Sequence, residues 1–136
     1  MKVAYVATYD ALSIRNYSGV GYYIAQSLKN QSILLAYIGP LREKYSLLFK
    51  GKQYLYNRLF NKRYLRDRGP LILKNYADQV FRKLSGINID IVFSPGSIPI
   101  AYLECDQPIV FWTGATFVGV NIPTAELWGI KSEIKL

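Results

Sequence analysis

Two glycines, Gly19 and Gly21, stand where a polar loop gives way to a helical pattern, shortly after an apolar run. The first N–H groups of a helix have no partner within the helix and carry the positive end of its dipole. Because glycine also lets a ligand approach the backbone closely, Gly19, Val20 and Gly21 are a candidate phosphate cradle. A second interpretation needs no ligand: Gly19 ends a turn, and Gly21 lets the helix pack closely on a sheet.

The spacing of these glycines excludes two common phosphate sites. A dinucleotide fingerprint needs a third glycine at the position of Ile24 and an acid about 20 residues later, and both are missing. No G-x-x-x-x-G-K-[ST] stretch occurs, which excludes a Walker loop. With no histidine and one cysteine, histidine-based catalysis, the usual zinc sites and an internal disulfide are also excluded. We therefore expect no metal and no resident cofactor, and we assign no catalytic residue.

The elements that would position these glycines alternate between strand and helix. The 136 residues fit one domain. Because strands that alternate with helices form parallel sheets, we predict an α/β fold: a single Rossmann-like domain with a mostly parallel sheet flanked by helices. Ser18 is expected to cap the first helix. Apolar runs predict strands over 2–8, 32–38, 90–93 and 108–113, of which the first two are expected to be buried. Helical spacing predicts helices over about 20–30, 45–60, 70–84 and 98–104.

Ligands of open parallel sheets bind beyond the carboxyl ends of the strands. The loops predicted there supply backbone amides, several hydroxyls and one carboxylate, Asp10. The Ser94 to Ser97 stretch is alternatively a turn with no ligand. The candidate residues in these loops are Tyr9, Asp10, Ser94, Gly96, Ser97, Thr113, Gly114 and Thr116.

The formal net charge of +8 comes from one segment. Ten basic and only two acidic residues lie between Arg42 and Lys74, interleaved with aromatic residues. Such a segment can lie on anionic lipid or bind a phosphate backbone, and is otherwise a solvated helix face. No nucleic acid is expected as a partner, because no RNA-recognition or helix-turn-helix pattern is present. The candidate basic surface is Arg58, Lys62, Arg63, Arg66 and Arg68.

The chain shows neither a run of about 18 uncharged apolar residues nor a signal peptide at its start, so we expect a cytoplasmic protein.

Taken together, several stretches resemble the N-terminal, acceptor-side domain of glycosyltransferase family 4 enzymes of the two-domain GT-B fold, in a bacterial branch. The likeness covers about residues 1–118, a Rossmann-like glycosyltransferase N-terminal domain, and residues 119–136 form a divergent tail. The stretches are MKVAYVATYD, NYSGVGYYIAQSL, IGPL, YLRDRGPLILKNYA, FSPGSIPIAYL and PIVFWTGATF.

The resemblance implies the acceptor-binding half of an enzyme that transfers a sugar from a nucleotide-sugar donor. It places Gly19 to Gly21 at the donor diphosphate and the loop residues above on the acceptor side. It also implies that the basic segment faces the membrane, so that the protein is peripheral to the inner face of the cell membrane.

Two departures qualify what the resemblance implies. Gly114 stands where related sequences have an aspartate, and the donor-binding domain is not in the sequence. We therefore expect a truncated enzyme, inactive alone, that needs a separate donor-binding chain or domain. The alternative is a non-catalytic binding module or remnant that docks on an anionic membrane or polyanion through residues 42–74.

Overall fold

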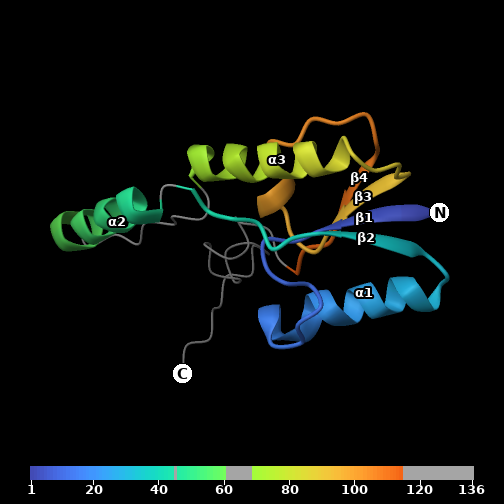
Figure 1. Ribbon diagram of the computed structural model, residues 1–136. Helices are drawn as coiled ribbons and strands as arrows, with labels where there is room; N and C mark the ends of the chain where they lie inside the picture. Colours follow the sequence, from blue (N-terminus) through green and yellow to red (C-terminus); the bar gives the residue numbers. More distant parts are fainter. Residues whose placement is uncertain (45, 61–68, 115–136) are drawn as a thin grey trace, which may run out of the picture.

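The computed structural model describes residues 1–44, 46–60 and 69–114. Its centre is a four-stranded parallel sheet with the strand order β2-β1-β3-β4. Helices cover both faces, α1 on one and α3 on the other (Figure 1). The predicted α/β, Rossmann-like class is therefore confirmed. The strands are β1 (Lys2–Val6), β2 (Leu34–Ile38), β3 (Ile91–Ser94) and β4 (Ile109–Phe111), and the helices are η1 (Asn16–Gly19), α1 (Val20–Asn30), α2 (Ser46–Phe60), α3 (Pro70–Leu84) and η3 (Ile98–Ile100).

Strand β1 lies at the centre of the sheet and is buried on both faces, as its continuous apolar run predicts. Ala4 and Val6 pack in the core formed with α3, and Tyr5 and Ala7 pack in the core formed with α1. This alternation follows from the two-residue period of a strand. One short strand thus holds both helix layers on the sheet.

Helix α3 has the bounds that the sequence predicts, 70 to 84. Pro70 occupies the first turn, where its missing N–H costs no hydrogen bond. Ile72, Tyr76, Val80 and Leu84, which are four residues apart, are all buried against the sheet. Helix α2, Ser46–Phe60, also agrees with the helix predicted over 45–60, of which residue 45 lies outside the described residues.

Three local predictions are wrong. Strand β2, predicted to be buried, is half-exposed with Leu34 at 66%, because it is an edge of the sheet. The predicted 98–104 helix is a single 3-10 turn, η3. Ser18 does not cap α1, because its own backbone is left-handed with φ 51° and the cap position falls to Gly19.

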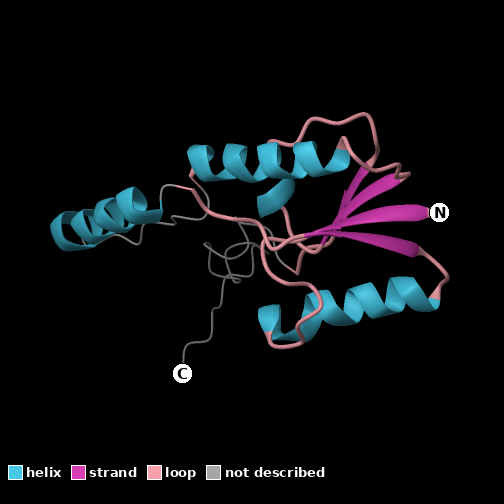
Figure 2. Cartoon of the chain, viewed as in Figure 1, coloured by secondary structure: helices cyan, strands magenta, loops and turns pink. Residues whose placement is uncertain are grey.

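The sheet has a topological switch point between β1 and β3. The chain leaves β1 through α1 to β2 on one side, and then returns past α3 to β3 on the other side. At such a point the connections diverge and leave a crevice outside the carboxyl ends of the strands, where ligands bind in open α/β sheets. The loops that follow the strands gather at this end of the sheet (Figure 2). We call this end the rim.

Among the helices of the described residues, none combines the length and apolar character of a membrane-spanning segment.

Candidate functional site

The chain enters α1 through three consecutive left-handed residues. Tyr17, Ser18 and Gly19 have φ values of 50°, 51° and 77°. Glycine adopts this conformation freely, but tyrosine and serine do so at a cost, and strain of this kind is concentrated at functional sites. Among the described residues, no side chain caps the amino end of α1, and the Val20 N–H donates to the Tyr17 carbonyl. The next N–H groups of the helix have no side-chain acceptor in this part of the chain, as at an anion-binding helix end.

Packing accounts for Gly21. The Tyr9 ring lies directly over it, so that an added Cβ would come within 3.0 Å of the ring and closer still to the hydroxyl. From the sheet, the Tyr5 hydroxyl donates a hydrogen bond of 2.7 Å to the Gly21 carbonyl. Together with the left-handed φ of Gly19, these contacts explain both glycines without a ligand. The close-packing interpretation therefore suffices for the pair.

Tyr9 is the side chain that joins this packing to the rim. Its ring stacks on Tyr17, with 5.7 Å between centroids and 24° between planes. The Tyr9 hydroxyl is buried and has no hydrogen-bond partner among the described residues. Any displacement of Tyr9 would uncover the backbone at Gly21.

Burial changes the ionisation of two of these phenols. It raises the pKa of Tyr5 well above the ordinary value of 10, and the neighbouring phenols of Tyr9 and Tyr37 raise that pKa further. Burial likewise raises the pKa of Tyr9, with a smaller contribution from Tyr17. Both phenols are neutral at physiological pH, so Tyr5 acts as a hydrogen-bond donor and not as a base.

We expect the buried phenol of Tyr5 to make the protein less stable in alkali. Above pH 10 the unfolded chain releases this proton while the folded chain keeps it, so the free energy of unfolding falls as the pH rises. One such group gives a slope of at most about 1.4 kcal/mol per pH unit. Urea denaturation at several pH values would measure it, and Tyr5→Phe should reduce the slope by the Tyr5 contribution and leave that of Tyr9.

The unchanged chain and Tyr5→Phe contain the same lysines, so the contribution of lysine titration cancels in the difference between their pH slopes. Tyr23→Phe removes the hydroxyl of a side chain that is 59% exposed and is the matched control. Equal flattening by both variants would contradict the assignment to Tyr5.

The loop after β3 contributes Gly96 and Ser97 to the rim. Ser94 is fully buried, and its hydroxyl donates a 2.6 Å hydrogen bond to the Gly96 carbonyl. The Ser94 carbonyl accepts a hydrogen bond from the Trp112 N–H. Ser94 therefore shapes the loop from inside, whereas Ser97 is exposed and Gly96 has open space beside its Cα.

Asp10 organises the loop after β1. Its Oδ1 accepts a 3.0 Å hydrogen bond from the Leu12 N–H, and its carbonyl accepts hydrogen bonds from the Ser13 N–H and the Asn16 side-chain amide. Asp10, which was predicted to lie on the acceptor side, thus stabilises the loop that precedes η1.

Thr113 and Gly114 follow β4 and are exposed. Arg58 lies on α2, which stands apart from the sheet (Figure 1). The remaining predicted residues lie outside the described residues: Thr116, Lys62, Arg63, Arg66 and Arg68.

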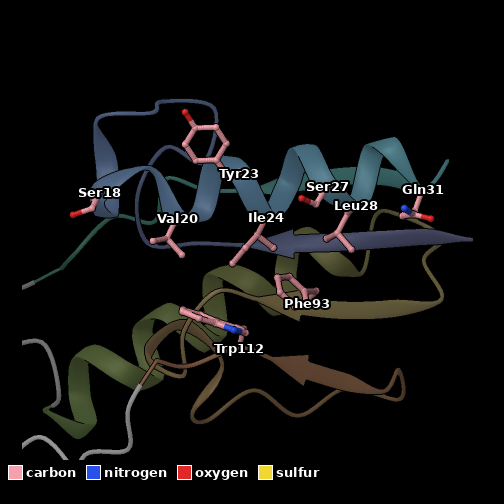
Figure 3. Close-up of a pocket in the computed structure, with 9 residues that line it drawn as sticks. All are labelled: Ser18, Val20, Tyr23, Ile24, Ser27, Leu28, Gln31, Phe93 and Trp112. Carbon is pink, nitrogen blue, oxygen red and sulfur yellow. The ribbon is translucent and has the colours of Figure 1, made fainter.

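The sequence did not reveal an apolar groove of about 640 Å³ between α1 and the β3–β4 half of the sheet. In Figure 3, Val20, Ile24 and Leu28 point from α1 toward Phe93 and Trp112. Ser18 lies at the end of this groove nearest the rim. The helical spacing of the α1 residues predicts a buried face, but only the sheet order shows that part of this face extends beyond the strands that α1 covers.

Within the described residues, no group of three or more histidine, cysteine, aspartate or glutamate side chains is placed to hold a metal ion. No protein-family model, curated protein or solved structure matches the chain.

Proposed function

We propose that this chain is a glycosyltransferase-type domain that holds the acceptor side of a sugar-transfer site at the rim. In this proposal the donor is a nucleotide sugar whose diphosphate approaches the amino end of α1. The proposal keeps the expected cytoplasmic location.

One observation carries the proposal: the strained amino end of α1, which has no side-chain cap among the described residues, follows β1 at the topological switch point of the sheet. The helix end supplies N–H donors and a positive dipole end, which favour a phosphate over a neutral ligand. The switch point supplies the crevice. The nearby rim residues Gly96 and Ser97 add an open backbone and a hydroxyl.

The groove gives a place for the uncharged part of a ligand. Trp112 is 44% exposed and shares the groove with Phe93. Aromatic rings offer a large apolar face together with a polar edge, a combination that suits the mixed surface of a sugar or a nucleobase. A ligand with its phosphate at the rim could therefore extend along α1.

The proposal includes no complete active site in this chain. Catalysis requires stronger binding of the transition state than of the substrates, and the rim carries few groups that hold a donor. We therefore expect weak, millimolar binding of a nucleotide sugar, and transfer only when a separate chain or domain supplies the donor side.

The test is an NMR titration of the ¹⁵N-labelled chain with inorganic diphosphate and with UDP-glucose. We expect shifts of the amide signals of Gly21, Tyr22 and Tyr23, and of Gly96 and Ser97. Gly96→Asp puts a negative charge beside the rim, at a glycine with nothing within 4 Å of an added Cβ. At contact distance in water this repulsion should weaken binding about fivefold.

Gly86→Asp is the matched control. Gly86 follows α3 and precedes β3, at the end of the sheet opposite the rim, and an added Cβ there would meet only the Lys83 carbonyl at 3.8 Å. The two variants have the same net charge. Equal weakening by both, shifts confined to residues away from the rim, or nanomolar binding of UDP-glucose by the chain alone would each contradict the proposal.

A further inference from the structure

Helix α2 exposes four leucines that the fold leaves uncovered. Figure 1 shows α2 standing apart from the sheet and from both helices that cover it. Leu47, Leu48, Leu55 and Leu59 are exposed by 82%, 73%, 55% and 69%. Scattered exposed leucines are ordinary, but a surface helix normally turns such residues toward a core. The α2 leucines therefore form an apolar surface on an element that makes little use of it within the domain.

Three of these leucines share one side of the helix. Leu48, Leu55 and Leu59 are seven and four residues apart, which at 3.6 residues per turn places them within about 40° of one another around the axis. We call them the leucine stripe. Lys52 lies on the same side, one turn after Leu48. The stripe thus spans about three turns, with Lys52 between Leu48 and Leu55 on the same side.

The charge of α2 has a single sign. The helix contains Lys50, Lys52 and Arg58 and no aspartate or glutamate. Arg58 donates a 2.9 Å hydrogen bond to the Tyr54 hydroxyl, on a different side of the helix from the stripe. Exposed leucines together with cations and without acids are features of helices that lie in the plane of an anionic membrane surface.

We propose that α2 lies in the surface of an anionic lipid bilayer, with the leucine stripe at the acyl boundary and the cations among the phosphate headgroups. Charge complementarity supports this occupant, because both the helix and the 42–74 segment around it are basic. A nucleic acid would use the cations but not the leucines. The proposal concerns residues distant from the rim and is independent of the sugar-transfer proposal.

The stem of the helix is anchored so that such binding would orient the domain. The Arg42 N–H donates a 2.9 Å hydrogen bond to the Gln79 side chain, and the Arg42 carbonyl accepts hydrogen bonds from the Gln79 and Asn75 side chains. The segment that leads to α2 is thus fastened to α3, and a membrane contact at α2 would be transmitted to the body of the domain.

The experiment is co-sedimentation of the 136-residue chain with phosphatidylcholine vesicles, with and without about a quarter of phosphatidylglycerol, at about 0.1 M salt. We expect binding to the anionic vesicles and little to the neutral ones. Leu55→Glu with Leu59→Glu should lower the partition coefficient at least about tenfold, since it removes two leucines that would enter the acyl boundary and adds two charges that anionic lipid repels.

Two further variants test whether a loss of binding comes from the missing leucine side chains, from unfolding or from the added charge. Leu55→Ala with Leu59→Ala keeps net charge and helix propensity and should still weaken binding severalfold. Leu34→Glu is the control, because Leu34 is 66% exposed but begins β2, outside the 42–74 segment. It should leave binding within about twofold of the unchanged chain, as a single charge on a distant surface contributes little.

Several outcomes would overturn the proposal. One is absence of binding to anionic vesicles at low salt. A second is a loss with Leu34→Glu as large as with the double glutamate variant. A third is binding that depends on Lys50 and Lys52 but not on the leucine stripe, together with tighter binding of an oligonucleotide than of vesicles, which would assign the surface to nucleic acid.

Discussion

Replacing Tyr5 with alanine is expected to lower the free energy of unfolding by about 3–5 kcal/mol, the range for large-to-small changes at buried aromatic residues. Tyr5 is fully buried in the central strand. Its ring contacts Tyr37 and Phe93, with centroids 5.7 Å and 5.4 Å away, and its hydroxyl holds the Gly21 carbonyl. Alanine would leave a cavity under α1 and release the helix end that forms the rim. Urea denaturation followed by circular dichroism would measure the loss.

Tyr5→Phe is the matched control, because it keeps the ring and removes only the hydroxyl. We expect a loss of about 1 kcal/mol, the net value of one hydrogen bond. Nearly equal losses for the two variants would show that the ring contributes little and would contradict the cavity argument. Both variants differ from Tyr23→Phe, which removes an exposed hydroxyl.

The parts of the fold that depend on local pattern were predictable. The four-residue spacing of Ile72, Tyr76, Val80 and Leu84 predicts α3. An uninterrupted apolar run predicts β1. The exposure of Leu34 was not predictable from the sequence, because whether a strand is central or at an edge depends on which strands pair. Pairing joins residues far apart in the chain, and the apolar content of β2 is the same in either position.

The candidate site divides in the same way. The position of Gly19 and Gly21 at the mouth of α1 follows from the sequence, but their roles depend on contacts. Gly21 is glycine because the Tyr9 ring covers it, and only the folded loop brings the two together. Serine is a common helix-capping residue, yet the backbone of Ser18 is left-handed, and the cap position of α1 is occupied by Gly19. Residue type indicates what a side chain can do, and backbone conformation decides whether it does so.

The groove was missed for a reason of topology. Val20, Ile24 and Leu28 are spaced as residues that a sheet should cover. Helix α1 connects β1 to β2, which lies on one side of β1, whereas β3 and β4 lie on the other side. Helix α1 therefore covers only part of the sheet. Trp112, at the far edge, is left facing the same space.

Gly39→Ala is expected to cost about 2–3 kcal/mol, as overpacking does where neighbours cannot move aside easily. An added Cβ at Gly39 would come within 2.5 Å of the Ala7 carbonyl and 3.1 Å of the Tyr9 carbonyl. Both contacts are backbone atoms of the segment that leads from β1 to the rim, so relief requires the loop itself to shift. Urea denaturation would measure the cost.

Gly51→Ala is the control for Gly39→Ala. Gly51 lies in α2 with nothing within 4 Å of an added Cβ, so we expect no loss of stability and at most a gain of about 1 kcal/mol from helix propensity. Because the Gly39 change presses on the backbone of Tyr9, it should also move the Tyr9 ring off Gly21, which the amide signals of residues 20–23 would report. If Gly39→Ala destabilises the protein but leaves the amide signals of residues 20–23 unchanged, then the packing of Gly39 after β2 does not affect the rim. Changed signals would mean that the fit of one glycine beside β1 determines how far the amino end of α1 is covered, and therefore how accessible it is to a phosphate.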